Sequence, residues 1–195
     1  PRGMSSAASD VYKRQEYRIL GTKPESCYDD ITKIAASTCD VPISLMTLVD
    51  RDKQWFKSKV GLEIQETPRD WSFCTHAIKE NIPLIIKDAF QDERFINNPL
   101  VTNDPKIRFY AGFPLRNRDG NKLGTLCVID RKPGNLSPKQ FNVMELLSKQ
   151  IVSFLELRKK SLNLLDALST LHKQEGILSV CSSGREVKNK EGDWM

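Results

Sequence analysis

Residues 107–130, IRFYAGFPLRNRDGNKLGTLCVID, carry the clearest local structural signal in the sequence. Two apolar runs, 107–115 and 123–129, flank the polar segment 117–122, which contains Asp119-Gly120. Asp-Gly between two apolar runs is a strong hairpin signal, because glycine tolerates the positive φ that tight turns require. The second run is apolar on both faces, as in a central strand that is covered on both sides. The stretch therefore predicts the middle hairpin of an antiparallel sheet.

The segments around this hairpin predict further helices and strands. Upstream we expect a helix from about Pro24 to Cys39, strands at 43–49 and 53–60, a short helix at 71–79 and a short strand at 83–87. Residues 88–105 lack a clear period, which favours a long loop with a turn of helix. The pattern predicts an α+β fold, in which an antiparallel sheet of five to six strands is flanked by helices.

A long helix is expected from Ser137-Pro138 to about residue 173, with serine as the N-cap and proline at the first position. Its predicted buried face comprises Phe141, Met144, Leu147, Ile151, Phe154 and Leu155. The leucines predicted to lack a partner within the domain are Leu155, Leu162, Leu165 and Leu168. We therefore expect a coiled-coil connector that pairs in parallel with a second chain, giving a homodimer.

Four parts of the chain are expected. Residues 1–15 are small and polar without periodicity, which favours a non-native or disordered tail, with the natural protein beginning upstream of Glu16. Residues 16–157 would form the domain and 158–175 the connector helix. Residues 176–195 would be the truncated start of a following segment that continues beyond Met195.

Composition excludes several classes of protein. The 39% apolar and 28% charged content is that of an ordinary globular protein. The net charge is +5, and the lysines and arginines are interspersed with aspartates and glutamates along the chain. This distribution argues against a nucleic-acid or membrane-surface partner. We find neither an apolar run long enough to cross a membrane nor a secretory signal, so we expect a cytoplasmic location. Five scattered cysteines favour reduced thiols over a disulfide framework.

Four motifs give the chain its resemblance to a known family. They are VDRD at 49–52 with QWFK at 54–57, SFCTHAI at 72–78, FYAGFPL at 109–115, and DG at 119–120 followed by LGTLCVID and KP. Over residues 16–157 this set resembles GAF domains, which bind small molecules or dimerise in bacterial sensors, phytochromes and phosphodiesterases. It is most similar to those that precede histidine kinase or diguanylate cyclase output domains, as in two-component systems. The resemblance implies a sensory domain that is not itself an enzyme and signals through its connector helix to an output domain.

The family places its pocket between one sheet face and the long loop with its short helices. The candidate ligand-binding residues in this sequence are Trp55, Phe73, Cys74, His76, Phe95, Ile96, Arg108, Tyr110 and Gly112. Aromatic residues with one convergent cation are typical of a small-molecule site, and they equally suit the core of a domain that binds no ligand. The identity of a ligand or cofactor stays open.

Two alternatives come from family members with other chemistry. Some GAF domains attach a bilin through a cysteine next to a histidine, or bind haem through a histidine. Here one residue separates Cys74 from His76, which favours a packed cysteine and a half-buried histidine. We therefore expect no bound bilin, haem or metal.

The other alternative is a redox enzyme of the free methionine sulfoxide reductase kind, working through Cys74 and Cys127. These two positions do not match the closer cysteine grouping of that enzyme. Cys127 lies between Leu126 and Val128, where we expect a buried thiol with a raised pKa. Cys74 is near the start of its helix, which could lower its pKa. Cys181 resembles half of a zinc knuckle, but Gly184 stands where the second cysteine would be.

Overall fold

The computed structural model describes residues 15–80 and 82–174. The predictions for residues 1–14 and 176–195, including that for Cys181, lie outside the described residues. The chain divides into two compact units, Pro1–Glu156 and Leu157–Met195. Helix α5, Pro138–Gln174, contributes residues to both.

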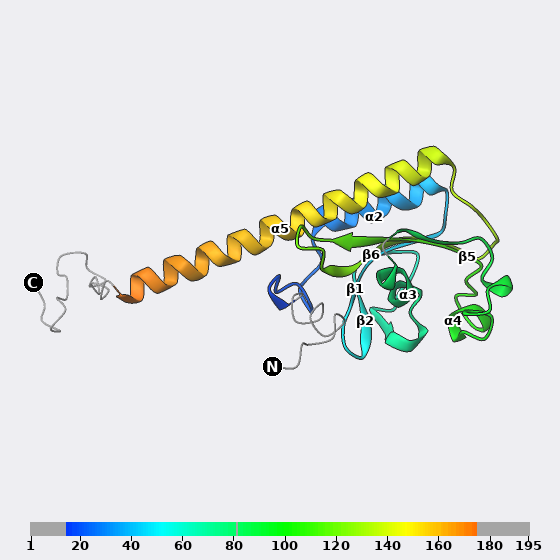
Figure 1. The fold of residues 1–195 in the computed structure, drawn as a ribbon, viewed down its shortest axis with the longest axis horizontal. Helices are drawn as coiled ribbons and strands as arrows, with labels where there is room; N and C mark the ends of the chain where they lie inside the picture. The colour runs from blue at the N-terminus through cyan, green and yellow to red at the C-terminus, as the bar shows by residue number, and fades with distance from the viewer. Residues whose placement is uncertain (1–14, 81, 175–195) are drawn as a thin grey trace, which may run out of the picture. The chain divides into compact units, whose positions relative to one another are not determined.

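A six-stranded sheet forms the centre of the first unit (Figure 1). Its strands are β1 (Ile43–Val49), β2 (Lys53–Val60), β3 (Glu66–Pro68), β4 (Leu84–Ile86), β5 (Phe109–Arg116) and β6 (Lys122–Asp130). The order is β3-β2-β1-β6-β5-β4, and every neighbouring pair is antiparallel. The predicted hairpin is β5–β6, with β6 between β1 and β5. The predicted fold class is confirmed.

Helices cover both faces of the sheet. On one face lie α2 (Ser26–Cys39) and the N-terminal part of α5, side by side (Figure 1). On the other face lie α3 (Phe73–Lys79) and α4 (Pro99–Thr102), accompanied by the 3₁₀ turns η1 (Arg69–Trp71) and η2 (Ala89–Gln91). The sheet therefore separates two apolar cores.

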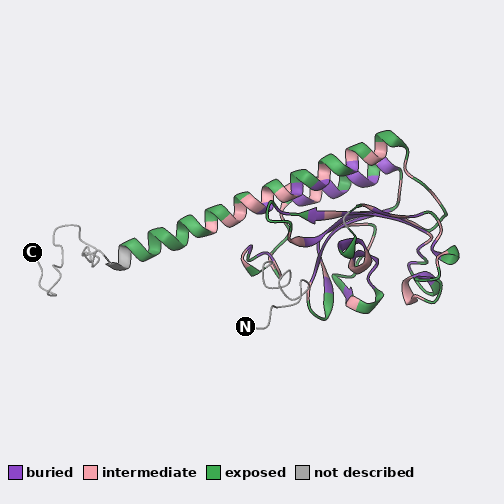
Figure 2. Cartoon of the chain, viewed as in Figure 1, coloured by how far each residue is buried: buried purple, intermediate pink, exposed green. Residues whose placement is uncertain are grey.

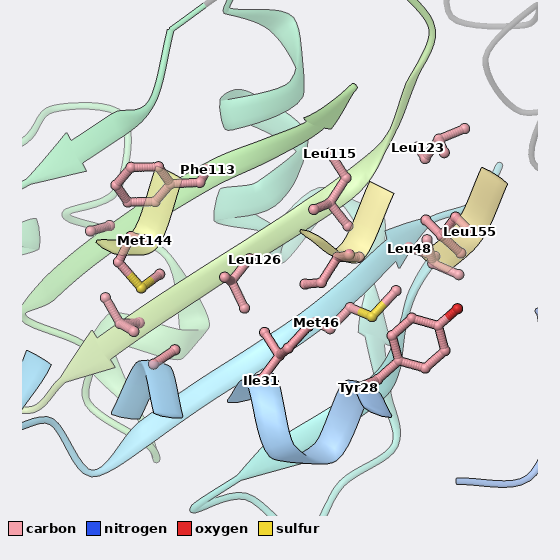
Figure 3. Packing of buried hydrophobic residues seen from close by; sticks show 14 of the residues in the cluster. Tyr28, Ile31, Met46, Leu48, Phe113, Leu115, Leu123, Leu126, Met144 and Leu155 are labelled. Atoms are coloured by element: carbon pink, nitrogen blue, oxygen red, sulfur yellow. The ribbon is translucent and has the colours of Figure 1, made fainter. Parts of the chain in front are cut away.

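The core under α2 and α5 is continuous along the sheet (Figure 3). Figure 2 shows the corresponding side of α5 as buried and the later turns as exposed. Leu155 is only 1% exposed and belongs to this core together with Tyr17 and Leu48, so the prediction that it lacks a partner within the domain is wrong. Ile34 of α2 is 49% exposed, because the face that α2 turns toward the sheet is formed by Tyr28, Ile31 and Ala35.

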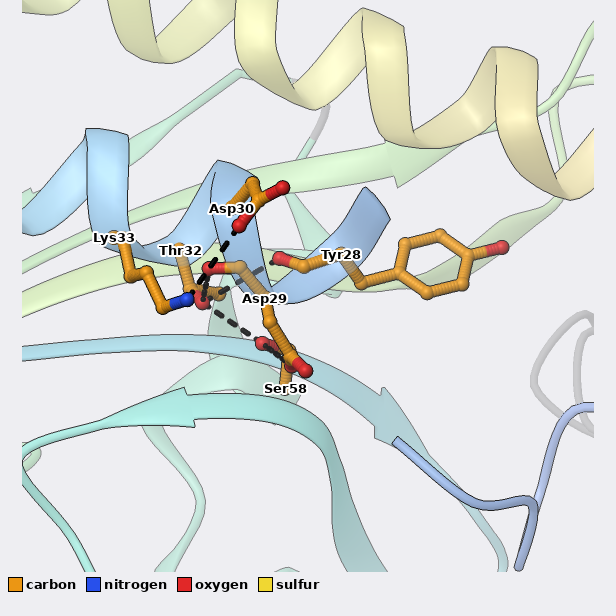
Figure 4. A network of polar contacts seen from close by, with 6 residues as sticks. All are labelled: Tyr28, Asp29, Asp30, Thr32, Lys33 and Ser58. Atoms are coloured by element: carbon orange, nitrogen blue, oxygen red, sulfur yellow. Dashed lines mark hydrogen bonds and ion pairs between the residues drawn. The ribbon is translucent and has the colours of Figure 1, made fainter. Parts of the chain in front are cut away.

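Polar contacts also attach α2 to β2 (Figure 4). The Ser58 hydroxyl donates to Asp29 Oδ1 at 2.6 Å, and its oxygen lies 2.8 Å from Thr32 Oγ1. Ser58 and Thr32 are both buried, so these bonds satisfy groups that would otherwise be costly to remove from water. The network fixes the rotation of α2 about its own axis.

Lys57 joins the N-terminal segment to the same strand. Its side chain is fully buried, and Nζ donates to Thr22 Oγ1 at 2.7 Å, to the Lys23 carbonyl at 2.7 Å and to Glu25 Oε1 at 2.6 Å. A β-bulge explains its direction: Ser58 and Phe56 pair with consecutive residues of β1, which leaves Lys57 as the extra residue of β2. Lys57 and Ser58 therefore point to the same face.

Within residues 15–80 and 82–174, no helix has both the length and the apolarity needed to cross a membrane.

Candidate functional site: a cavity beside two cysteines

Helix α3 brings the first candidate residues onto the sheet. Ser72 is its N-cap, and the Ser72 hydroxyl oxygen accepts the Thr75 backbone N–H at 3.0 Å. The helix therefore begins at Phe73 rather than at the predicted residue 71. Phe73 and Cys74 then face β5 and β6, in the second apolar core.

A small cavity lies between α3 and this face of the sheet, with a volume of about 30 Å³. Its walls come from the sheet, from α3 and from the segments around residues 62–67 and 100–107: Leu45, Gln54, Phe56, Leu62, Ile64, Thr67, Ser72, Phe73, Cys74, Leu100, Pro105, Ile107, Tyr110, Cys127 and Ile129. Pockets for drug-sized ligands measure roughly 300 to 1,000 Å³. In this conformation the cavity admits a molecule of only a few heavy atoms.

Gln54, Ser72 and Thr67 are polar residues of the cavity wall. Ser72 Oγ is hydrogen-bonded to Gln54 Oε1, and both residues are buried. Thr67 Oγ1 is also buried, yet within the part of the chain that the structure describes it has no hydrogen-bond partner. An unpaired buried hydroxyl costs about 1 to 3 kcal/mol. A bound molecule that pairs with Thr67 would recover part of this free energy.

Two cysteines of the cavity wall lie close together. The sulfurs of Cys74 and Cys127 lie 3.9 Å apart, and the Tyr110 hydroxyl donates to Cys74 Sγ at 3.3 Å. Gly112 makes this contact possible, because a Cβ at residue 112 would collide with the ring and hydroxyl of Tyr110. Both thiols are buried and reduced.

The environment separates the acidities of the two thiols. Burial works against the Cys74 thiolate, but hydrogen bonds from Cys127, Thr125, Thr47 and Tyr110 outweigh it and lower the pKa of Cys74 to about 6. The hydrogen bond with Cys74, and then burial, raise the pKa of Cys127, as predicted from its apolar neighbours. Cys74 is therefore the more acidic thiol of the pair.

Phe95 and His76 stand behind the cavity wall. The Phe95 ring stacks on Phe73, with centroids 4.1 Å apart and planes 7° apart, and His76 meets Phe95 edge-on at 4.9 Å. Burial, and then the charges of Lys79 and Arg94, lower the pKa of His76, which is half-buried. His76 is thus a neutral side chain packed on an aromatic ring.

Arg108 does not converge on the cavity. Its guanidinium makes two bonds of 2.7 Å to the Asp88 carboxylate and lies over the Phe90 ring at 4.7 Å. This pairing lowers the pKa of Asp88. Ile96, another candidate, is exposed. The cation of the predicted site is therefore a structural anchor for the segment that begins at residue 88.

Trp55 lies on the other face of the sheet. It is half-buried and packs against the core under α2 and α5, whereas its neighbour Phe56 lines the cavity. Successive side chains of a strand point to opposite faces, so only one of the two can face the cavity. Gln54 and Phe56, which lie two residues apart in β2, are the cavity residues. The alternation in QWFK was the signal that could have found them.

Other regions of the surface carry weaker sites. A hollow of about 710 Å³ beside α2 has charges of both signs, from Lys33, Asp40, Asp130, Arg131 and Lys132, and lies open to solvent. Among residues 15–80 and 82–174, no group of three or more histidine, cysteine or acidic side chains could hold a metal ion. The cavity with its cysteine pair remains the more enclosed site.

Comparisons with known proteins agree with this architecture. The chain is 38% identical over 149 residues to a cyclic di-GMP phosphodiesterase of Pseudomonas aeruginosa, and the match spans 74% of this chain but only 25% of that protein. The chain thus covers about a quarter of the length of this curated relative. The phosphodiesterase activity is that of the whole relative, of which this chain matches only a part.

Solved structures share the fold at low sequence identity. The GAF domain of an Acinetobacter phosphoenolpyruvate-protein phosphotransferase superposes with a TM-score of 0.58 at 17% identity, covering 78% of this chain and 95% of that one. A free methionine-R-sulfoxide reductase of Neisseria meningitidis gives 0.57 at 14% identity, covering 83% and 96%. The model of the GAF domain family matches residues 23–154, most of the described chain. This chain belongs to the GAF domain family.

Proposed function

We propose that this chain is the sensory part of a bacterial signalling protein. A small molecule binds in the cavity, two copies pair through α5, and the bound state biases the paired helices and a covalently linked output domain. The domain is regulatory and not catalytic in this proposal. The sequence identity to one quarter of the length of a phosphodiesterase supports this role. A domain family that is found in proteins with different activities is suited to regulating those activities.

The observation that carries the proposal is the unpaired, buried hydroxyl of Thr67, a residue that lines the cavity. A ligand that fits would carry one group that hydrogen-bonds to Thr67. The rest of its surface would be apolar, because most of the cavity wall is aliphatic or aromatic. Leu62 and Ile64 on one segment, with Leu100 and Pro105 on another, close over the cavity. A ligand of more than a few heavy atoms enters only if these segments move apart.

Hydrogen bonds offer a route from the sheet to α5. Asn117, at the turn of the β5–β6 hairpin, donates to the Tyr17 hydroxyl at 3.1 Å. The Tyr17 hydroxyl donates to Glu156 Oε1 at 2.6 Å. Glu156 is the last residue of the first compact unit, so a shift of the hairpin would reach α5 where it leaves the domain.

The exposed leucines of α5 define the seam, which is the row of residues through which we propose that two copies pair. Leu157, Leu164, Leu168 and Leu171 are all exposed, and with Ser161 they repeat at alternating steps of three and four residues. This heptad spacing is that of a two-stranded coiled coil. It replaces the predicted set, since Leu155 is buried within the domain. A parallel pair places both domains on the same side of an output domain.

A ligand screen tests the proposal. Small apolar compounds with one polar group should raise the thermal midpoint of the wild-type chain, because they bind only the folded state. Thr67→Val should weaken binding of each hit by roughly two- to tenfold, the contribution of one neutral hydrogen bond. Thr170→Val, on the exposed face of α5, is the matched control and should leave affinity unchanged. Hits that bind Thr67→Val as tightly as the wild type would refute this site.

A further inference from the structure

We propose that Cys74 and Cys127 form a redox modification site, at which hydrogen peroxide or a hydroperoxide of similar size oxidises the two thiols to an intramolecular disulfide. This chemistry belongs to the domain alone and does not depend on the proposed sensory role. The disulfide would join α3 to the central strand β6.

Distance is the first support. The sulfurs are 3.9 Å apart, and a disulfide requires about 2.05 Å. The two cysteines belong to different elements that pack against each other, so side-chain rotation with a small shift of α3 closes the gap. Cys39, the third buried thiol among the described cysteines, lies on the opposite side of the sheet in the core under α2 and α5. The pair is thus specific.

Access is the second support. Both cysteines line the cavity, whose volume of about 30 Å³ suits a molecule of two heavy atoms such as hydrogen peroxide. The same dimensions keep out bulky oxidants and ordinary thiol reagents. Gln54, Thr67 and Ser72, which also line the cavity, are polar residues that could hydrogen-bond to a peroxide that enters.

The surroundings identify the attacking sulfur. Tyr110 donates to Cys74, and the Thr47 and Thr125 hydroxyls, 2.9 Å apart, complete a buried cluster of donors around it. The lowered pKa of Cys74 agrees with this arrangement, whereas burial raises the pKa of Cys39 to about 11. Only a thiolate attacks a peroxide at a useful rate.

The reaction proceeds in two balanced steps. The Cys74 thiolate attacks one oxygen of the peroxide, the O–O bond breaks, and the departing hydroxide takes up the proton that the thiol released, which leaves a sulfenic acid and water. Cys127 then attacks the Cys74 sulfur, the S–S bond forms, and the hydroxide that departs takes the Cys127 proton as a second water. Two electrons pass from the sulfurs to the peroxide.

Mass spectrometry of the full chain tests the proposal. Reduced protein is treated with stoichiometric hydrogen peroxide, denatured, alkylated and digested. The expected result is the loss of two hydrogen atoms and a peptide pair crosslinked between Cys74 and Cys127, reversed by dithiothreitol. The crosslink should form roughly tenfold faster than Cys39 oxidises. Free Cys74 and Cys127 under conditions that oxidise the half-exposed Cys27 would overturn the proposal.

Variants and a second oxidant separate the steps. Cys127→Ser should stop at a Cys74 sulfenic acid, which dimedone labels when the oxidised protein is denatured in its presence, and the matched variant Cys39→Ser should still form the crosslink. Cumene hydroperoxide should react at least about tenfold more slowly than hydrogen peroxide, because the cavity excludes it. Equal rates with both oxidants would overturn the cavity as the route. The wild-type measurement needs no substitution, so a variant that fails to fold does not weaken the test.

Discussion

Leu126 is a residue on which the domain's stability depends. It is fully buried in β6, between Met46 of β1 and Phe113 of β5. Leu126→Ala should reduce the free energy of unfolding by about 2 to 5 kcal/mol, as core truncations do. Leu136→Ala, at a half-buried position in the segment before α5, should cost much less. Urea unfolding of both variants decides the matter, and equal losses would mean that the core is misplaced.

Tyr110 should control the acidity of Cys74. Tyr110→Phe removes one donor to the thiolate without changing the shape of the ring, so it should raise the pKa of Cys74 by about 1 to 2, the equivalent of one hydrogen bond to a charged group. Ultraviolet thiolate absorbance measured against pH reports this change. Phe109→Leu, on the opposite face, is the control, and an unchanged pKa in Tyr110→Phe would contradict the assignment.

The lowered pKa of Cys74 determines how this residue makes the free energy of unfolding depend on pH. The pKa of Cys74 is about 6 in the folded protein and near the ordinary value of 9.0 in the unfolded chain. The folded state therefore binds fewer protons in this window, so Cys74 stabilises the fold most above pH 9 and less as the pH falls toward 6. Tyr110→Phe should flatten this slope.

The residue scale is where the sequence was least informative about the site. The motif QWFK predicts the right strand but the wrong residue, Trp55 instead of Phe56, because size alone does not tell which face of a strand a residue takes. Arg108 has the chemistry of a ligand contact and instead pairs with Asp88, twenty residues earlier. The approach of Cys74 to Cys127 depends on how α3 packs on β6, which no local pattern encodes.

At the scale of elements, Lys57 attaches the N-terminal segment to β2. Lys57→Met keeps the length of the stem but removes three hydrogen bonds, so we expect a loss of about 1 to 3 kcal/mol in the free energy of unfolding. Lys53→Met, which breaks an exposed pair with Glu66, is the control and should change stability little. Urea unfolding measures both, and similar small effects would show that the buried contacts contribute nothing.

Most elements could be predicted because their patterns are local. The strands at 43–49 and 53–60 agree residue for residue with β1 and β2, since apolar runs bounded by polar turns leave little choice. Strand β3 has only three residues, too few to show a period. The error at Leu155 is of another kind, because a helix carries the same leucine pattern whether it meets a sheet or a second helix.

For the whole molecule, assembly is the property to test. Replacing Leu164 and Leu171 by glutamate should weaken the dimer by roughly a hundredfold or more, because each buried leucine contributes about 1.5 to 3 kcal/mol. The control replaces Asn163 and Thr170 by glutamate, because these residues are exposed but do not belong to the proposed heptad seam. Light scattering over a concentration series gives the dissociation constant. A wild-type monomer at tens of micromolar, or equal effects of both pairs, would rule out this seam.

The strand order of the sheet has a consequence for synthesis. Strands β1 to β3 form one half of the sheet and β4 to β6 the other, and the only pairing between the halves is that of β1 with β6. A nascent chain that ends before Lys122 therefore presents the buried, apolar β1 as an open edge, and the contact that covers it spans most of the domain. We therefore expect truncated translation products that end there to aggregate more readily than the complete domain, because an unpaired apolar edge strand can pair with another chain.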